Sequence, residues 1–349
     1  MESRPRDSGP RSNGRRHRTL LAALITASLA VPVSGAARPA AVPAPAPVVL
    51  APLRAATPAA LAERYAVNLA GIRAAGRMAA DHGDRRRAAA LRAMADPARR
   101  FLTFDGRDGG RAAEVFGDLS RAERIAVLVP GSDTSLDAYG RFRAGAATLQ
   151  RELGDGAAVI AWLGFETPGT VSAEVLTPGR AVDAAPRLQR FVRELSAARP
   201  CLQRPACSTT PGKIGRTGPG PTARISLLCH SYGSVVCARA ASGLPVADIV
   251  LYGSPGTGVD TVGQLRTRAT VWAGRGADDW IADVPHVRLP LLFTTVGFGT
   301  DPVSEAFGAR AFDAGGGGHS DYLKPGSTSL RNLARIVSGQ PPSEGGRHA

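Results

Sequence analysis

Residues 227–237 read LLCHSYGSVVC, and this stretch decides the fold. An apolar run, ARISLL at 223–228, precedes Ser231, and a run suited to a helix follows Gly233. A strand, a tight turn and a helix in this order form a nucleophile elbow, which exposes a serine hydroxyl. The usual motif is Gly-x-Ser-x-Gly, because the strand and the helix approach closely and leave room only for small residues beside the serine. Cys229 stands at the first glycine's position, and a cysteine is small enough for it. We therefore expect an elbow around Ser231; the alternative is a serine in an ordinary buried turn.

The other apolar runs indicate the architecture around this turn. Short runs rich in Val, Ile and Leu lie at 125–129, 157–163, 223–228, 247–253, 269–274 and 290–299. Helix-like stretches, such as 136–153 and 181–198, separate most of them. Alternation of this kind is typical of βαβ units, in which helices cover both faces of a parallel sheet. We expect one α/β domain with a doubly wound, mostly parallel sheet.

Three further elements flank this sheet. The stretches FLTFD (101–105) and AAEVFG (112–117) are joined by a glycine turn, which predicts an antiparallel pair at the sheet edge. Residues 58–97 carry apolar side chains at spacings of three and four, which predicts an N-terminal helical preface, either a packing element or a lid. A closing helix is expected at about 327–338.

The N-terminal segment predicts export. Three arginines within residues 15–18 precede an apolar run at 20–31, and small residues suited to cleavage follow at 34–36. We expect a signal peptide at 1–36 and a secreted or cell-wall-associated protein with no membrane span after the signal is removed. The Arg15-Arg16 pair suggests the twin-arginine route, but the arginine at position 18 stands where an apolar residue is usual, so the export route stays open.

The rest of the chain divides by composition. Residues 37–57 are rich in Ala and Pro and are interpreted as an extended tether, 58–338 as the α/β domain, and 339–349 as a flexible tail. The formal charge is +14, from 43 Lys and Arg against 29 Asp and Glu, but the arginines are spread thinly and no nucleic-acid-binding signature accompanies them. No nucleic-acid partner is expected, and the oligomeric state is left open.

Four cysteines in an exported protein are expected to pair. Cys201 and Cys207 lie in the irregular stretch 198–223, away from the edge where ligands bind, and we expect a structural disulfide between them with no catalytic role. Cys229 and Cys237 bracket Ser231, and a disulfide between them would brace the elbow if their Cα atoms lie within about 7 Å. The alternative is buried free thiols packed as small apolar side chains.

A serine nucleophile needs a base, and the partners in this arrangement follow in the order serine, acid, histidine. His319 lies in the loop GGGGHSDYL, after the last predicted strand and before the closing helix, which is where the base is expected. His286 leads into a predicted strand and His348 is next to last in the chain, so both fit less well.

The acid is expected in VWAGRGADDWIADV, residues 271–284, where a strand ends in a turn. Asp279 is preferred over Asp278 because Trp-Ile follows it, an acid-then-apolar order seen at this position in lipases and esterases. Its task would be to orient His319. Asp301 and Asp313 lie in the histidine's own loop and fit less well.

An oxyanion hole requires two N–H donors. We expect one from the backbone of Tyr232, directly after the serine. The stretch VLVPGSDTS (127–135) ends a strand and turns at Pro-Gly, which leaves the backbone N–H of Ser132 as the second donor. The region 164–180, GFETPGTVSAEVLTPGR, is a candidate wall of the substrate pocket.

Six stretches together carry a family resemblance: VPGSDTSLDAYG, LLCHSYGSVVC, YGSPGTG, AGRGADDW, GFGTDPVSEAFGARAF and GGHSDYL. Over residues 58–338 the chain resembles a family of bacterial secreted α/β-hydrolases of unknown function. The resemblance implies the α/β-hydrolase fold and hydrolysis, with Ser231 as nucleophile, Asp279 as acid and His319 as base. Cys229 departs from the glycine commoner in that family.

The function expected from these features is an exported serine hydrolase. It would cleave an ester or similar acyl bond of a small-molecule or lipid-like substrate through an acyl-enzyme, with no cofactor and no metal ion. An acyltransferase would use the same triad, so that alternative stays open. The remaining alternative is a catalytically silent protein of this fold that binds at the cell wall.

Overall fold

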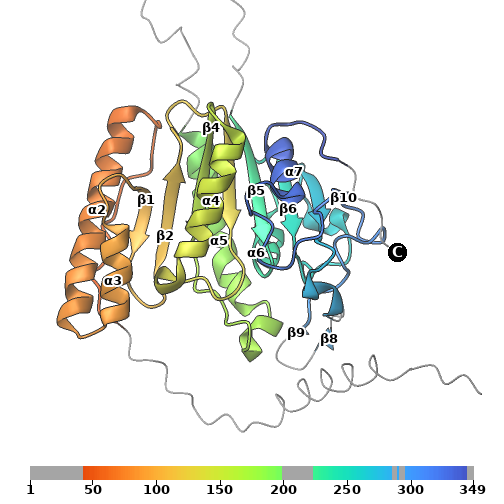
Figure 1. Cartoon of the computed structure of the whole chain (residues 1–349), viewed down its shortest axis with the longest axis horizontal. Coiled ribbons are helices and arrows are strands. Elements are labelled where there is room, and N and C mark those ends of the chain that lie inside the picture. Colours follow the sequence, from red (N-terminus) through yellow and green to blue (C-terminus); the bar gives the residue numbers. More distant parts are fainter. Residues whose placement is uncertain (1–41, 199–222, 285–288, 291–294, 344–349) are drawn as a thin grey trace, which may run out of the picture. The chain divides into compact units, whose positions relative to one another are not determined.

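The computed structural model describes residues 42–198, 223–284, 289–290 and 295–343. In these residues the chain forms an eight-stranded sheet (Figure 1). The strand order is β1-β2-β4-β3-β5-β6-β7-β10. Their bounds are β1 Arg100–Asp105, β2 Arg111–Phe116, β3 Arg124–Val129, β4 Ala157–Leu163, β5 Arg224–His230, β6 Asp248–Tyr252, β7 Thr270–Gly274 and β10 Arg310–Ala311. The pairs β1–β2 and β2–β4 are antiparallel, and the other neighbours are parallel. The predicted mostly parallel α/β sheet is confirmed, as is its antiparallel edge pair.

The strand order reverses between β3 and β5. The chain crosses from β3 outward to β4 and then returns past β3 to β5, so that β3 and β5 are direct neighbours. Their register pairs Val129 with Cys229, which brings the turns after both strands side by side. Open α/β sheets bind ligands at the carboxyl ends of the strands at such a switch point.

Helices cover both faces of the sheet (Figure 1). The helices α4 (Gly140–Leu153) and α7 (Thr328–Val337) pack on one face, and α5 (Gly179–Ala197) and α6 (Gly233–Ala240) on the other. The helices α2 (Pro58–Asp81) and α3 (Arg85–Met94) lie beside β1. The short 3-10 helices are η1 (Leu136–Ala138), η2 (Ala173–Leu176), η4 (Val262–Leu265) and η5 (Trp280–Asp283).

The central strands feed two separate core layers. In β3, Ile125 and Val127 belong to the layer under α5 and α6, whereas Ala126 and Leu128 belong to the layer under α4 and α7. Successive side chains of a strand point to opposite faces, so a strand covered on both faces reads as a continuous apolar run. This is why the sequence pattern located these strands.

The helical preface is a packing element. Thr57 caps α2 by accepting a hydrogen bond from the N–H of Ala60, and Pro58 stands in the first turn, where its missing N–H costs nothing. Ile72 of α2 and Leu91 of α3 are buried with Phe101 of β1. These contacts hold the preface against the sheet.

Residues within the segments predicted as a tether (37–57) and a flexible tail (339–349) pack on the domain. Leu53 and Ala56 are buried, and the N–H of Ala56 donates to the carbonyl of Ala198 at 2.9 Å. At the other end, Ser343 exchanges hydrogen bonds with Asn332 of α7. The predicted signal peptide and the predicted Cys201–Cys207 disulfide lie outside the described residues.

The described parts of the run 290–299 are not strands of the main sheet, so the prediction is wrong for them. Leu289–Pro290 (β8) and Thr295–Val296 (β9) instead form a separate two-stranded antiparallel sheet. Gly297 and Gly299 then adopt φ values of +87° and +79°, which end the extended backbone. The place beside β7 is taken by β10. No helix within the described ranges is long and apolar enough to span a bilayer.

Candidate active site

Ser231 lies in the tight turn between β5 and α6, with a backbone φ of +52°. A residue with a side chain rarely adopts this left-handed conformation, and here the N–H of Ser231 donates to the carbonyl of Tyr252 at 3.1 Å. A Cβ atom added to Gly233 would lie 2.6 Å from the carbonyl oxygens of Val129 and Pro130. The turn therefore has the strain and the close strand–helix approach of a nucleophile elbow.

Cys229 and Cys237 form a disulfide across this turn, which confirms the predicted pairing. Their Cα atoms are 6.4 Å apart, within the range that a disulfide spans, and both residues are fully buried. The bond joins the last part of β5 to the second turn of α6. The cysteine at the position of the first motif glycine is thus part of a covalent link between the two elements that hold Ser231.

His319 contacts both Ser231 and Asp279. Its Nε2 lies 3.0 Å from the Oγ of Ser231, and its Nδ1 lies 2.9 and 3.1 Å from the two carboxylate oxygens of Asp279. Because a carboxylate only accepts hydrogen bonds, Nδ1 carries the proton and Nε2 is left to accept from the serine hydroxyl. The structure thus brings together the three residues that the sequence analysis selected.

Asp279 and its neighbour Asp278 lie in different environments. Asp279 is buried and also accepts a hydrogen bond from the N–H of Ile281 at 2.9 Å, whereas Asp278 is exposed. Burial raises the pKa of Asp279, but the hydrogen bonds from His319 and Tyr322 outweigh burial and hold that pKa below its usual range. The carboxylate facing His319 is therefore ionised at neutral pH.

Tyr322 is a site residue that sequence reasoning missed. Its hydroxyl donates to Oδ2 of Asp279 and accepts from the N–H of Gly276 at 3.0 Å. Burial and the adjacent carboxylate raise the pKa of Tyr322 far above its usual value, so the phenol stays a donor. It follows His319 by three residues in the same loop, but no spacing rule links a tyrosine there to the acid.

His230, directly before the serine, was also missed. Its Nε2 donates to the backbone carbonyl of His319 at 2.8 Å, and its ring lies 5.1 Å from the ring of Tyr252 and 4.8 Å from that of His319. Burial, reinforced by His319, lowers the pKa of His230 to about 3. A neutral imidazole thus ties the His319 loop to β5. The His319 ring also lies 4.7 Å from the ring of Trp280.

The two backbone N–H groups predicted for an oxyanion hole belong to Ser132 and Tyr232, which both border the cavity beside Ser231. Neither N–H donates to an acceptor within the described part of the chain. A Cβ atom at Gly131 would lie 2.6 Å from the Cβ of Ser231, so only a glycine lets this turn approach the serine so closely.

A cavity of about 1020 Å³ opens at these residues. Apolar side chains from both sides of the sheet line it. They include Phe142, Val175, Leu176, Tyr252, Pro255, Ile281, Val284, Phe298 and Leu323. The predicted wall segment 164–180 contributes Thr170, Val175 and Leu176. A mostly apolar cavity with a few convergent polar groups is typical of a small-molecule site.

Asp301 and Asp313, two alternative acids of the sequence analysis, have other partners. Asp301 pairs with Arg275, and Asp313 accepts from the N–H of Gly315 at 2.8 Å. His286 and His348 lie outside the described residues. Within the described ranges, no three His, Cys, Asp or Glu side chains gather as a metal site.

Comparisons with known proteins agree with this architecture. A family model described as alpha/beta hydrolase matches residues 105–207 and 211–289, more than half of the chain. Uncharacterized proteins of Mycobacterium bovis and Mycobacterium tuberculosis are 33% identical to it over 205 residues, which cover 53% of this chain and 70% of each relative. A second uncharacterized M. tuberculosis protein is 28% identical over 273 residues, which cover 68% of this chain and 38% of that protein.

Similar solved structures include two hydrolases. The crystal structure of esterase PE8 is 16% identical with a TM-score of 0.39, and the match covers 66% of this chain and 98% of the esterase. An α/β serine hydrolase without a lid from Xanthomonas campestris is 18% identical with a TM-score of 0.40, and the match covers 70% of this chain and 94% of that protein.

Proposed function

The chain belongs to the alpha/beta hydrolase family, and on that premise we propose that it is an exported serine hydrolase that cleaves an ester or similar acyl bond through an acyl-enzyme on Ser231. The observation that carries this proposal is the position of His319, which contacts both the Oγ of Ser231 and the carboxylate of Asp279. A hydroxyl, an imidazole and a buried carboxylate in contact form the arrangement in which a serine becomes a nucleophile.

Each residue then has a defined task. The Oγ of Ser231 attacks the acyl carbon, and its proton passes to Nε2 of His319. The backbone N–H groups of Tyr232 and Ser132 stabilise the oxyanion of the tetrahedral intermediate. Asp279 holds Nδ1–H and stabilises the imidazolium. When the bond to the leaving group breaks, His319 returns the proton to that group, and water then releases the acyl chain by the same steps.

Export is proposed from the N-terminal sequence. A basic stretch, an apolar run and small residues lie within positions 1–36 in the order of a secretory signal. The Cys229–Cys237 disulfide is in keeping with an oxidising compartment, because cytosolic proteins seldom keep such bonds. N-terminal sequencing of the secreted protein tests this proposal, and the first residue found should lie near position 37.

Covalent labelling tests the catalytic proposal. The purified mature protein is incubated with a fluorophosphonate probe, and the labelled peptide is mapped by mass spectrometry. We expect the label on Ser231 and an initial burst of p-nitrophenol when p-nitrophenyl esters are added, because acylation precedes deacylation. Ser231→Ala should lose both signals. Labelling of another residue, or of none, in the folded wild-type protein would refute the proposal.

A further inference from the structure

We propose that the segment 164–180 forms the wall of the cavity that holds an aliphatic acyl chain, and that the Tyr232 phenol sets the position of this wall. The inference rests on the proposed acyl hydrolysis and adds the part of the substrate that this wall contacts. The segment runs from the end of β4 to the start of α5 and includes η2. Val175 and Leu176 of η2 face the cavity.

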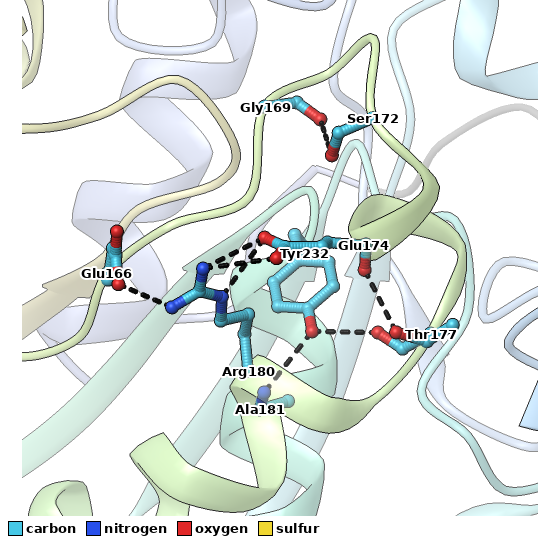
Figure 2. A network of polar contacts seen from close by, with 8 residues as sticks. All are labelled: Glu166, Gly169, Ser172, Glu174, Thr177, Arg180, Ala181 and Tyr232. Carbon is cyan, nitrogen blue, oxygen red and sulfur yellow. Dashed lines mark hydrogen bonds and ion pairs between the residues drawn. The ribbon is translucent and has the colours of Figure 1, made fainter. Parts of the chain in front are cut away.

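The Tyr232 side chain holds both ends of this segment. It is 1% exposed, and its hydroxyl donates to the carbonyl of Thr177 at 2.9 Å and accepts from the N–H of Ala181 at 3.2 Å (Figure 2). Its ring stacks on that of Phe165, near the start of the segment, with ring centres 6.4 Å apart. One buried side chain from the elbow thus fixes where the segment leaves the sheet and where it returns.

Two ion pairs link parts of the segment on its exposed side. Figure 2 shows the guanidinium of Arg180 between the carboxylates of Glu166 and Glu174. The two glutamates are 48% and 53% exposed, so water screens both ion pairs and each contributes little to stability. The Tyr232 side chain is buried, its bond with Ala181 is buried and its bond with Thr177 is partly buried, and we therefore assign to these two bonds the main role in positioning the wall.

The segment also contacts the turn that carries Ser132. The carboxylate of Asp133 accepts from the N–H of Thr170 at 3.1 and 3.2 Å, and the N–H of Asp133 donates to the carbonyl of Pro168 at 3.0 Å. The same segment is therefore joined to both turns whose backbone N–H groups are proposed to bind the oxyanion. A displaced wall changes how a long acyl group lies against these donors.

The position of His319 indicates which part of the substrate meets this wall. The leaving group must lie near His319, because His319 supplies its proton. The His319 ring lies 4.8 Å from that of His230, whose ring in turn contacts Tyr252 and Tyr322, two residues of the core layer under α4 and α7. Val175 packs on the other layer, under α5 and α6, as do Tyr232 and Phe298. The acyl chain, on the side of Ser231 away from the leaving group, therefore extends along the apolar wall.

Chain-length selectivity tests the inference. The measured quantity is kcat/KM for p-nitrophenyl octanoate divided by kcat/KM for p-nitrophenyl acetate, in mature wild-type protein first shown to be labelled by the fluorophosphonate probe. Leu176→Trp fills the proposed chain site and should lower this ratio about tenfold or more. Tyr232→Phe keeps the ring and the backbone N–H but loses both phenol hydrogen bonds. It should lower the ratio about fivefold or more, mainly through KM for the octanoate.

Two controls separate positioning from a general loss of stability. Val182→Ala shortens an exposed apolar side chain of α5 that does not line the cavity, and Tyr65→Phe removes only the hydroxyl of a tyrosine of α2; both should keep the wild-type ratio. An unchanged ratio in Leu176→Trp overturns the acyl wall, and an unchanged ratio in Tyr232→Phe overturns the anchoring role of the phenol. Absence of labelling in the folded wild type refutes the serine hydrolase and this inference together.

Discussion

Tyr322 donates a hydrogen bond to Oδ2 of Asp279, the carboxylate that contacts Nδ1 of His319. The phenol also accepts a hydrogen bond from the N–H of Gly276, in the turn after β7 that carries Asp279. Asp279, the proposed acid, is thus contacted by a residue of the loop that carries His319. Within the described residues, two of the three hydrogen-bond partners of the Asp279 carboxylate, His319 and Tyr322, belong to that loop, and the third is the N–H of Ile281.

Tyr322→Phe should therefore reduce ester hydrolysis while the fold persists. The substitution removes a hydrogen bond to a charged group, and we expect kcat/KM to fall about 10- to 100-fold. Steady-state kinetics on p-nitrophenyl acetate measure this, with circular dichroism as a check on folding. Tyr65→Phe, a partly buried tyrosine of α2 away from the cavity, is the matched control. Wild-type kcat/KM in Tyr322→Phe would contradict a positioning role.

The two adjacent aspartates should behave very differently when each is changed to asparagine. Asp279→Asn offers Nδ1 of His319 an amide and favours the wrong tautomer, which should lower kcat by about four orders of magnitude. Asp278→Asn changes an exposed side chain, and its kcat should stay within about threefold of wild type. Steady-state measurement of kcat for both variants shows which aspartate is the acid. A larger loss at Asp278 would reverse the assignment of the acid.

Ser231, Asp279 and His319 were accessible from the sequence because their positions follow from chain order. Each lies in a turn or loop after a strand of a parallel sheet, and the carboxyl ends of such strands meet at one edge. Tyr322 and His230 were not accessible in this way. They act through a buried carboxylate and a backbone carbonyl, and those contacts depend on how the loop after β10 folds back on β5.

The strands, too, could be predicted from the sequence only in part. A strand buried on both faces, such as β4, leaves a continuous apolar run in the sequence. The edge strand β10 consists of Arg310–Ala311, both exposed, and carries no such signal. The apolar run at 290–299 was therefore predicted as a strand of the sheet, whereas β10 was not predicted. Apolar composition locates buried strands but says little about short edge strands.

His230 should make folding stability depend on pH. Its ordinary pKa is 6.5, and in the folded protein it is about 3. Between these values the unfolded chain binds a proton that the folded protein does not, so the free energy of unfolding rises with pH. This contribution is complete above about pH 6.5 and is lost as the pH falls toward about 3.

Urea unfolding at several values between about pH 4 and pH 7 measures this effect. The wild-type free energy of unfolding should fall steeply on acidification, and His230→Gln, which cannot titrate there, should show a weaker slope. His82→Gln replaces an exposed histidine at the end of α2 and should keep the wild-type slope. Equal slopes in wild type and His230→Gln would show that His230 is not the group responsible.

The Cys229–Cys237 disulfide should stabilise the fold without taking part in the chemistry. It closes a short loop, with a sequence separation of 8 residues, and linking a loop of about this size contributes about 2–3 kcal/mol to the free energy of unfolding. The effect is measured in a protein in which Cys201 and Cys207 are replaced by alanine, so that Cys229 and Cys237 are the two cysteines left of the four in the chain. In that background, dithiothreitol should lower the free energy of unfolding of the protein that keeps Cys229 and Cys237. Dithiothreitol should not change the free energy of unfolding of a variant in which Cys229 and Cys237 are alanine as well. The probe should still label Ser231 in both proteins. Alkylation of both thiols after denaturation without reductant would show that the bond does not form.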